Sequence, residues 1–132
     1  MRSKMCLALA DAQKIVAACK VEAANNKWNV TIAVVDDGGF LVHVERLDGA
    51  VGQSAAIAIA KAQTAAATRT PTKTLEDVVK ERPATLAFPG RVAVQGGLPI
   101  MHQGECVGGV GVSGAKSHED EQVAKAGLRA LE

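Results

Sequence analysis

The sequence predicts an α+β fold in which helices flank an antiparallel sheet. Its predicted strands come in groups, two within residues 30–47 and three within residues 91–112, and do not alternate singly with helices. Two hairpin signals, Asp36-Asp37-Gly38-Gly39 and Gln103-Gly104, separate neighbouring strands. The length of 132 residues fits a single domain, 1–132, that can bury its own core.

Apolar periodicity identifies the elements of the first half. A stripe at spacings of three and four predicts a helix over 8–26, ending near Asn25-Asn26. Strands are predicted at 30–36 and 40–47. Because 30–35 is almost entirely apolar, we expect the first strand to be central, with helices on both faces.

An alanine-rich helix is predicted over 54–68, with Ser54 as its N-cap and Thr70-Pro71 after its end. This helix is apolar nearly all round and carries one charge, Lys61. We therefore expect it to be buried, and a subunit interface is one place that would bury it.

The second half is predicted to contain a short helix over 74–81, with Glu76 and Asp77 in its first turn, and an irregular stretch over 83–90. A final helix, capped by Ser117, runs to about Leu131. Three more strands lie between these helices, at 91–95, 98–102 and 105–112.

Composition argues against several classes of function. Fifteen Lys and Arg against 14 Asp and Glu give a net charge of +1, which does not favour a nucleic-acid partner. No apolar run reaches the length of a membrane span, and the first residues lack a signal-peptide core, so we expect a cytoplasmic protein. The three scattered cysteines contain no Cys-x-x-Cys pair and predict reduced thiols.

Glycines recur in VGGVGVSG at 107–114, which contains G-x-G-x-x-G. A dinucleotide site would need a further strand, which the chain does not supply. The glycines instead predict a strand that a helix, another subunit or a flat ligand approaches closely. The loop that begins with Ser113 and Gly114 precedes a helix start, where free N–H groups could hold an anion.

Two cations are candidate ligand contacts. Arg46 offers a planar fork to a carboxylate, although an ion pair with Asp48 would also explain it. Lys61 shares a helix face with Thr64. It is either a surface lysine or a partly desolvated ammonium that meets an anionic or carbonyl ligand, and in the second case it is the catalytic candidate.

Each of the three histidines has an ordinary structural explanation. His43 lies within a predicted strand, and His102 lies beside a turn. Acidic residues near His118 are explained by the helix dipole more simply than by a metal ion, so no metal site is predicted.

Four motifs in order resemble one known family. They are Arg46-x-Asp48-Gly49-Ala50, Lys61-Ala62-x-Thr64-Ala65-Ala66, Gly96-Gly97-x-Pro99-Ile100 and VGGVGVSG at 107–114. Together they resemble the GlcG/HbpS-like, or haem-degrading domain, family, which includes the C-terminal domain of PduO-type corrinoid adenosyltransferases. The resemblance covers about 8–131, and the segment 26–39 looks most like the GlcG members.

The resemblance implies a profilin-like three-layer α/β/α sandwich with a five-stranded antiparallel sheet. It also implies homo-oligomers, from dimers to octamers, and a small-molecule ligand, with haem or another tetrapyrrole as the sharpest candidate. His43 and His102 are then the candidate axial ligands of the haem iron. The residues expected to bind the ligand are Arg46, Asp48, Lys61, Thr64, Gly97, Pro99, Ser113 and Gly114.

Two further functions stay open at this point. One is a cytosolic enzyme or accessory protein of a catabolic pathway that acts on a small hydroxy- or keto-acid. The acid would lie on Arg46 and the helix start near Gly114, with Lys61 as acid, base or electrostatic clamp. The other is a structural oligomerisation module.

Overall fold

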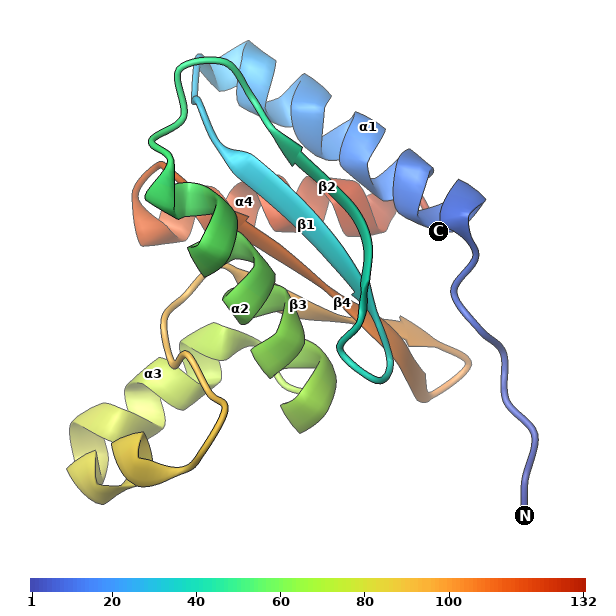
Figure 1. Cartoon of the computed structure of the whole chain (residues 1–132), viewed down its shortest axis with the longest axis vertical. Coiled ribbons are helices and arrows are strands. Elements are labelled where there is room, and N and C mark those ends of the chain that lie inside the picture. The colour runs from blue at the N-terminus through green and yellow to red at the C-terminus, as the bar shows by residue number, and fades with distance from the viewer.

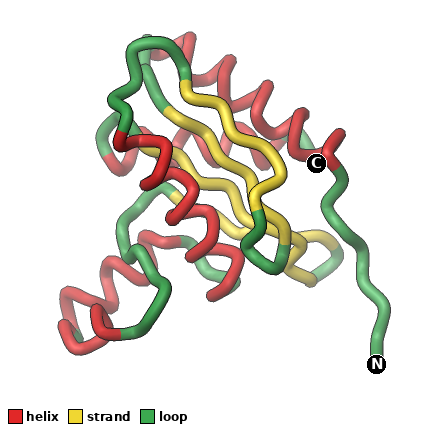
Figure 2. Tube along the Cα trace, viewed as in Figure 1, coloured by secondary structure: helices red, strands yellow, loops and turns green.

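A computed structural model describes all residues, Met1–Glu132, and shows an antiparallel sheet between two helical layers (Figures 1 and 2). The four strands lie in the order β2-β1-β4-β3. Helices α1 and α4 cover one face and α2 the other, which confirms the α+β class. The elements are α1 (Leu9–Asn26), β1 (Thr31–Asp36), β2 (Leu41–Arg46), α2 (Gln53–Thr68), α3 (Thr72–Glu81), the 3₁₀ helix η1 (Pro83–Ala87), β3 (Gly97–His102), β4 (Glu105–Ser113) and α4 (Ser117–Arg129).

The predicted fifth strand at 91–95 is wrong, because this segment pairs with side chains and not with the sheet. The backbone N–H of Val92 donates to Thr64 Oγ1 of α2 at 2.9 Å. The N–H of Gln95 donates to Glu76 Oε1 of α3 at 3.2 Å. Since these donors are already satisfied, the segment lies beside the helices and β3 remains an edge strand.

Three predicted helix starts also differ from the structure. Gly52 occupies the N-cap position of α2, and Ser54 lies one residue into the helix, where its hydroxyl donates to the Val51 carbonyl at 2.6 Å. Helix α3 begins at Thr72, two residues early, so its first turn holds no acidic residue. Lys116 is the N-cap residue of α4, and its N–H donates to the Glu119 carboxylate at 3.0 Å.

Strand β1 is buried on both faces, as its apolar run predicted. Towards α1 and α4, Ile32 and Val34 join a core of branched side chains. Towards α2, Ala33 and Val35 meet mainly alanines, with Ile59 at the margin. The two layers are therefore packed differently: the first buries bulky side chains, and the second brings helix and sheet backbones close together.

Helix α2 lies directly on β4 because the facing strand residues are glycines. A Cβ atom at Gly111 would lie 2.1 Å from the Ala58 carbonyl oxygen, and one at Gly109 would lie 2.2 Å from that of Ala62. The strand predicted from VGGVGVSG, in which glycines allow a close approach, is thus present. Of the three partners considered for it, the structure shows a helix, α2. No hollow remains between β4 and α2 for a flat ligand.

This packing predicts that Gly111→Ala destabilises the protein by about 3 kcal/mol, because α2 must move away from the sheet. Urea unfolding followed by circular dichroism measures the change. The matched control is Gly52→Ala at the exposed start of α2, where the backbone is already helical (φ −56°) and the nearest atom is the end of Arg46. The control should be neutral or stabilised by up to about 1 kcal/mol. Equal stability of the two variants would contradict the close packing.

Candidate functional site

The site residues predicted from the sequence do not form one site. Arg46 pairs through Thr31 with Ser113, so these residues and the adjoining Asp48 and Gly114 lie at one end of the sheet. Arg46 and Asp48 are exposed, and no ion pair joins them. None of the four lines a hollow of the structure.

Lys61 is neither a surface lysine nor a residue at a pocket. It is 2% exposed, and its Nζ donates to the Val112 carbonyl at 3.0 Å and to Asp120 Oδ2 at 3.2 Å. The Lys61 ammonium is therefore desolvated, as one of the two interpretations expected, but its partner is the carboxylate of Asp120 in α4. Two of its three N–H donors are engaged in this way, and Lys61 borders no hollow through which a ligand could reach it.

Thr64 and Gly97 lie nearby and have structural partners as well. Thr64 accepts the Val92 N–H, and the N–H of Gly97 donates to Thr72 Oγ1 at 2.8 Å. The motif residues Thr64 and Gly97 thus fasten the segment before β3 to α2 and α3. Of the eight residues expected to contact a ligand, only Pro99 borders a hollow.

The Lys61–Asp120 pair joins α2 to α4 past the end of β4. Asp120 also accepts the Ala115 N–H at 3.0 Å through its second oxygen. Burial raises the pKa of Asp120 above its ordinary value of 3.8, and the Lys61 ammonium acts in the opposite direction. The carboxylate consequently depends on Lys61 to stay ionised in the interior.

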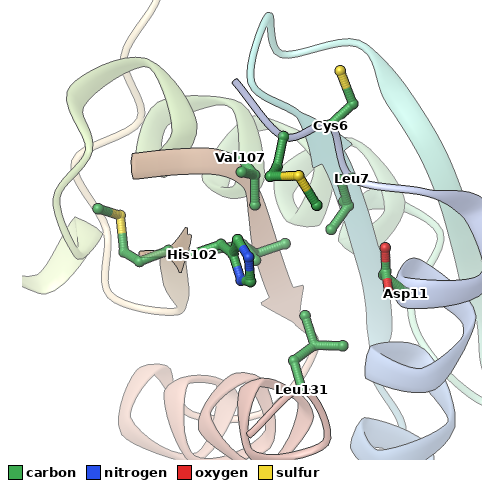
Figure 3. Close-up of a pocket in the computed structure, with 9 residues that line it drawn as sticks. Cys6, Leu7, Asp11, His102, Val107 and Leu131 are labelled. Atoms are coloured by element: carbon green, nitrogen blue, oxygen red, sulfur yellow. The ribbon is translucent and has the colours of Figure 1, made fainter. Parts of the chain in front are cut away.

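The hollow with suitable chemistry lies at the other end of the sheet. It has a volume of about 210 Å³. Figure 3 shows His102, Val107, Leu7 and Leu131 around it, with Asp11 at one side. Since β4 spans nine residues, this end lies roughly 25 Å from Ser113. The lining residues are Met5, Cys6, Leu7, Asp11, Ile100, Met101, His102, Val107 and Leu131.

Two neighbouring hollows extend this one. The first, of about 420 Å³, shares Met5 and His102 with it and adds Lys4. The second, of about 220 Å³, shares Met101 and adds Pro99. We call the three hollows together the His102 groove. The hollow of Figure 3 and the one beside Pro99 have largely apolar walls, whereas the hollow of about 420 Å³ is mainly polar. The polar residues come mainly from β3, the β3–β4 turn and the segment before α1.

The segment before α1 forms one wall of the groove, and sequence reasoning missed it. This segment has no regular structure. Two ion pairs hold it: Arg2 to Glu105 at 3.1 Å, and Lys4 to Asp37. These acids belong to the β3–β4 and β1–β2 hairpins, so the wall depends on contacts across the chain. The three apolar residues Met5-Cys6-Leu7 were the signal in the sequence that could have indicated this wall.

Among the candidate axial ligands, the structure places His102 and not His43 at a hollow. His43 Nε2 lies 3.1 Å from Glu45 Oε1 on β2 and lines no hollow. Met5, Cys6 and Met101 join His102 at the groove. Imidazole, thiolate and thioether groups are among the side chains that ligate haem iron. No cluster of three or more His, Cys, Asp or Glu residues is arranged to hold a separate metal ion.

Comparison with known proteins gives consistent relatives. Residues 7–129 match the family described as haem degrading protein HbpS-like. Protein GlcG of Escherichia coli K12 is 41% identical over 114 residues, which cover 86% of this chain and 85% of GlcG. A double mutant of HbpS from Streptomyces reticuli has a TM-score of 0.93 at 35% identity, covering 100% of this chain and 91% of HbpS. PduOC, in its complex with haem, has a TM-score of 0.87 at 27% identity, covering 96% and 95%. No helix of the structure is both long and apolar enough to cross a membrane.

The buried ion pair predicts a pH-dependent defect. Lys61→Met leaves Asp120 without its cation and should destabilise the protein by about 3–5 kcal/mol at pH 7. Removing the cation raises the pKa of Asp120 in the folded variant further above its ordinary value. The folded variant is therefore most stable at low pH, where Asp120 is protonated, and it loses stability as pH rises from about 4 through the raised pKa. The difference from wild type should therefore be smaller at pH 4 than at pH 7.

Urea unfolding at pH 4, 5.5 and 7 measures this difference. The control is Lys125→Met, whose lysine is exposed and pairs with Glu121 along α4. It should change stability by less than about 1 kcal/mol at each pH. A Lys61→Met defect independent of pH would show that Asp120 is not the group left without its cation.

Proposed function

The chain belongs to the family of haem-degrading HbpS-like proteins, and from this premise we propose that it binds haem in the His102 groove, with His102 as an axial ligand of the iron. The observation that carries the proposal is the meeting of His102, Met5, Cys6 and Met101 on one aliphatic groove. The haem complex of PduOC supports it, because that protein shares this fold over nearly its whole length.

The groove suits the apolar body of a porphyrin. Leu7, Ile100, Val107 and Leu131 present aliphatic surface from four separate parts of the chain. Burying such surface contributes roughly 25 cal/mol per Å². The low aromatic content of the sequence is therefore no obstacle, since aliphatic and thioether side chains supply the apolar contact here.

His102 is favoured over His43 because it lines the groove and its side chain has no partner within the protein. It is exposed at the end of β3, one residue before the turn, and no acidic group lies within ion-pair distance. No side-chain hydrogen bond or ion pair therefore competes with iron for its ring nitrogens. Met5 or Cys6, across the groove in the segment before α1, supplies the second ligand.

The geometry gives no support to an enzyme that uses Lys61 on a hydroxy- or keto-acid. Lys61 is closed off by Asp120, and Arg46 lies at the opposite end of the sheet from the groove. Binding is therefore the function proposed. Homo-oligomerisation remains part of the proposal, supported by the uncharged outer surface of α2, whose single charge is buried.

Titration with hemin tests the ligand and its position. Wild type should show a saturable, stoichiometric shift of the Soret band. His102→Ala should weaken binding at least about tenfold and change the band, because an iron–imidazole bond is lost. His43→Ala should match wild type, since His43 contacts Glu45 and no hollow. Equal titrations for His102→Ala and wild type would contradict ligation by His102.

Thiol labelling tests the position of the haem by a second readout, from the wall of the groove that contains Cys6. Cys6 is exposed, whereas Cys19 and Cys106 are buried, and burial raises the pKa of Cys19 to about 12. Iodoacetamide should therefore label one cysteine of the native protein, and Cys6→Ser should abolish labelling. Hemin at saturation should slow the labelling of Cys6 at least several-fold. Unchanged labelling with hemin bound would place the haem elsewhere.

A further inference from the structure

A cationic hollow adjoins the His102 groove, and we infer that it binds the carboxylates of the ligand, with Arg69 as the principal contact. This inference rests on the proposed function, because it concerns the acidic edge of the molecule whose apolar body fills the groove. The hollow has a volume of about 70 Å³ at the tip of the β3–β4 hairpin. Its lining residues are Arg2, Lys4, Arg69, Gly104, Glu105 and Cys106.

The cationic hollow is connected to the groove through shared residues. It shares Lys4 and Glu105 with the hollow of about 420 Å³, which in turn shares Met5 and His102 with the hollow of Figure 3. A flat molecule with an apolar body and charged groups at one edge could therefore occupy the groove with that edge towards the β3–β4 turn. The porphyrin of haem, with two propionates on one edge, has this shape.

The charges of the hollow leave one cation free. Arg2 pairs with Glu105 and Lys4 pairs with Asp37. The charges of the Arg2 guanidinium and the Lys4 ammonium are therefore largely compensated by carboxylates. Arg69 has no acidic group within 4.0 Å, and no side-chain hydrogen bond engages it. Its five N–H donors in a planar fork match a carboxylate better than a lysine would.

Arg69 also ends α2. Arg69 is the C-cap residue and lies in the left-handed region at φ 55°, where its N–H donates to the Ala65 carbonyl. Glycine or asparagine is the usual choice at such a position, because a larger side chain adds strain. The chain carries an arginine there, as it carries Lys27 at the same position of α1, and Arg69 lines the cationic hollow.

Other arginines do not offer the same arrangement. Arg91 lies over the Phe88 ring at 5.0 Å, beyond α3. Arg46, expected from the sequence to bind a carboxylate, is at the far end of the sheet. Arg69 is thus the uncompensated arginine that borders the hollows around His102.

Binding of hemin and of hemin dimethyl ester to wild type and Arg69→Gln tests the inference. The ester keeps the iron and the ring but has no charged carboxylate. Arg69→Gln should weaken hemin binding about tenfold and leave ester binding unchanged, because only hemin loses a charge-assisted bond. Arg69→Lys should fall between wild type and Arg69→Gln. The control, Arg82→Gln, changes an exposed arginine after α3 and should affect neither ligand.

The outcomes separate this inference from the proposed function. If wild type binds hemin, His102→Ala weakens it and Arg69→Gln leaves it unchanged, the carboxylate contact is wrong and haem binding stands. If Arg69→Gln weakens hemin and ester equally, the residue acts on the fold or the ring, and the inference is again wrong. If neither compound saturates wild type, both proposals fail. Circular dichroism of each variant establishes that it is folded.

Discussion

The backbone of α2 lies directly against the glycines of β4, and this contact determines which parts of the sheet stay open to a ligand. Because Gly109 and Gly111 carry no side chains, the carbonyls of Ala58 and Ala62 approach the strand more closely than any Cβ atom would allow. The sheet face under α2 is therefore sealed. A ligand must be accommodated elsewhere, and the structure offers the opposite end of the sheet, where β3 and β4 turn and the segment before α1 crosses them.

The buried Lys61–Asp120 pair is the polar counterpart of that contact. A lysine in the middle of an apolar helix would be costly to bury alone, and the carboxylate of α4 offsets the loss of hydration. The same ammonium donates to the Val112 carbonyl, so one side chain connects both helical layers with the end of β4. Lys61, the catalytic candidate of the sequence analysis, thus holds α2 in place against β4 and α4.

Much of the fold could be predicted because its elements follow local rules. The apolar run of β1, the Asp-Asp-Gly-Gly turn at 36–39 and the Gln103-Gly104 hairpin all correspond to the structure. The strand at 91–95 could not be ruled out locally, because its hydrogen bonds go to Thr64 and Glu76, far away in sequence. The groove was hidden for a related reason: ion pairs to both hairpins position the wall that contains Met5 and Cys6.

The motifs that carry the family resemblance are mainly those that pack α2 against the sheet. The motif Lys61-Ala62-x-Thr64 supplies the lysine of the buried ion pair. The motif Gly96-Gly97 supplies the hydrogen bond that ties the start of β3 to α3, and VGGVGVSG supplies the strand glycines that α2 contacts. The residues of the His102 groove lie mostly outside these motifs, on the first seven residues, the end of β3 and the start of β4. A shared fold can therefore persist while the groove changes, because substitutions there leave the α2–β4 contact intact. Relatives of this chain are consequently best compared at the positions of Met5, Cys6, Arg69 and His102, which border the proposed haem site.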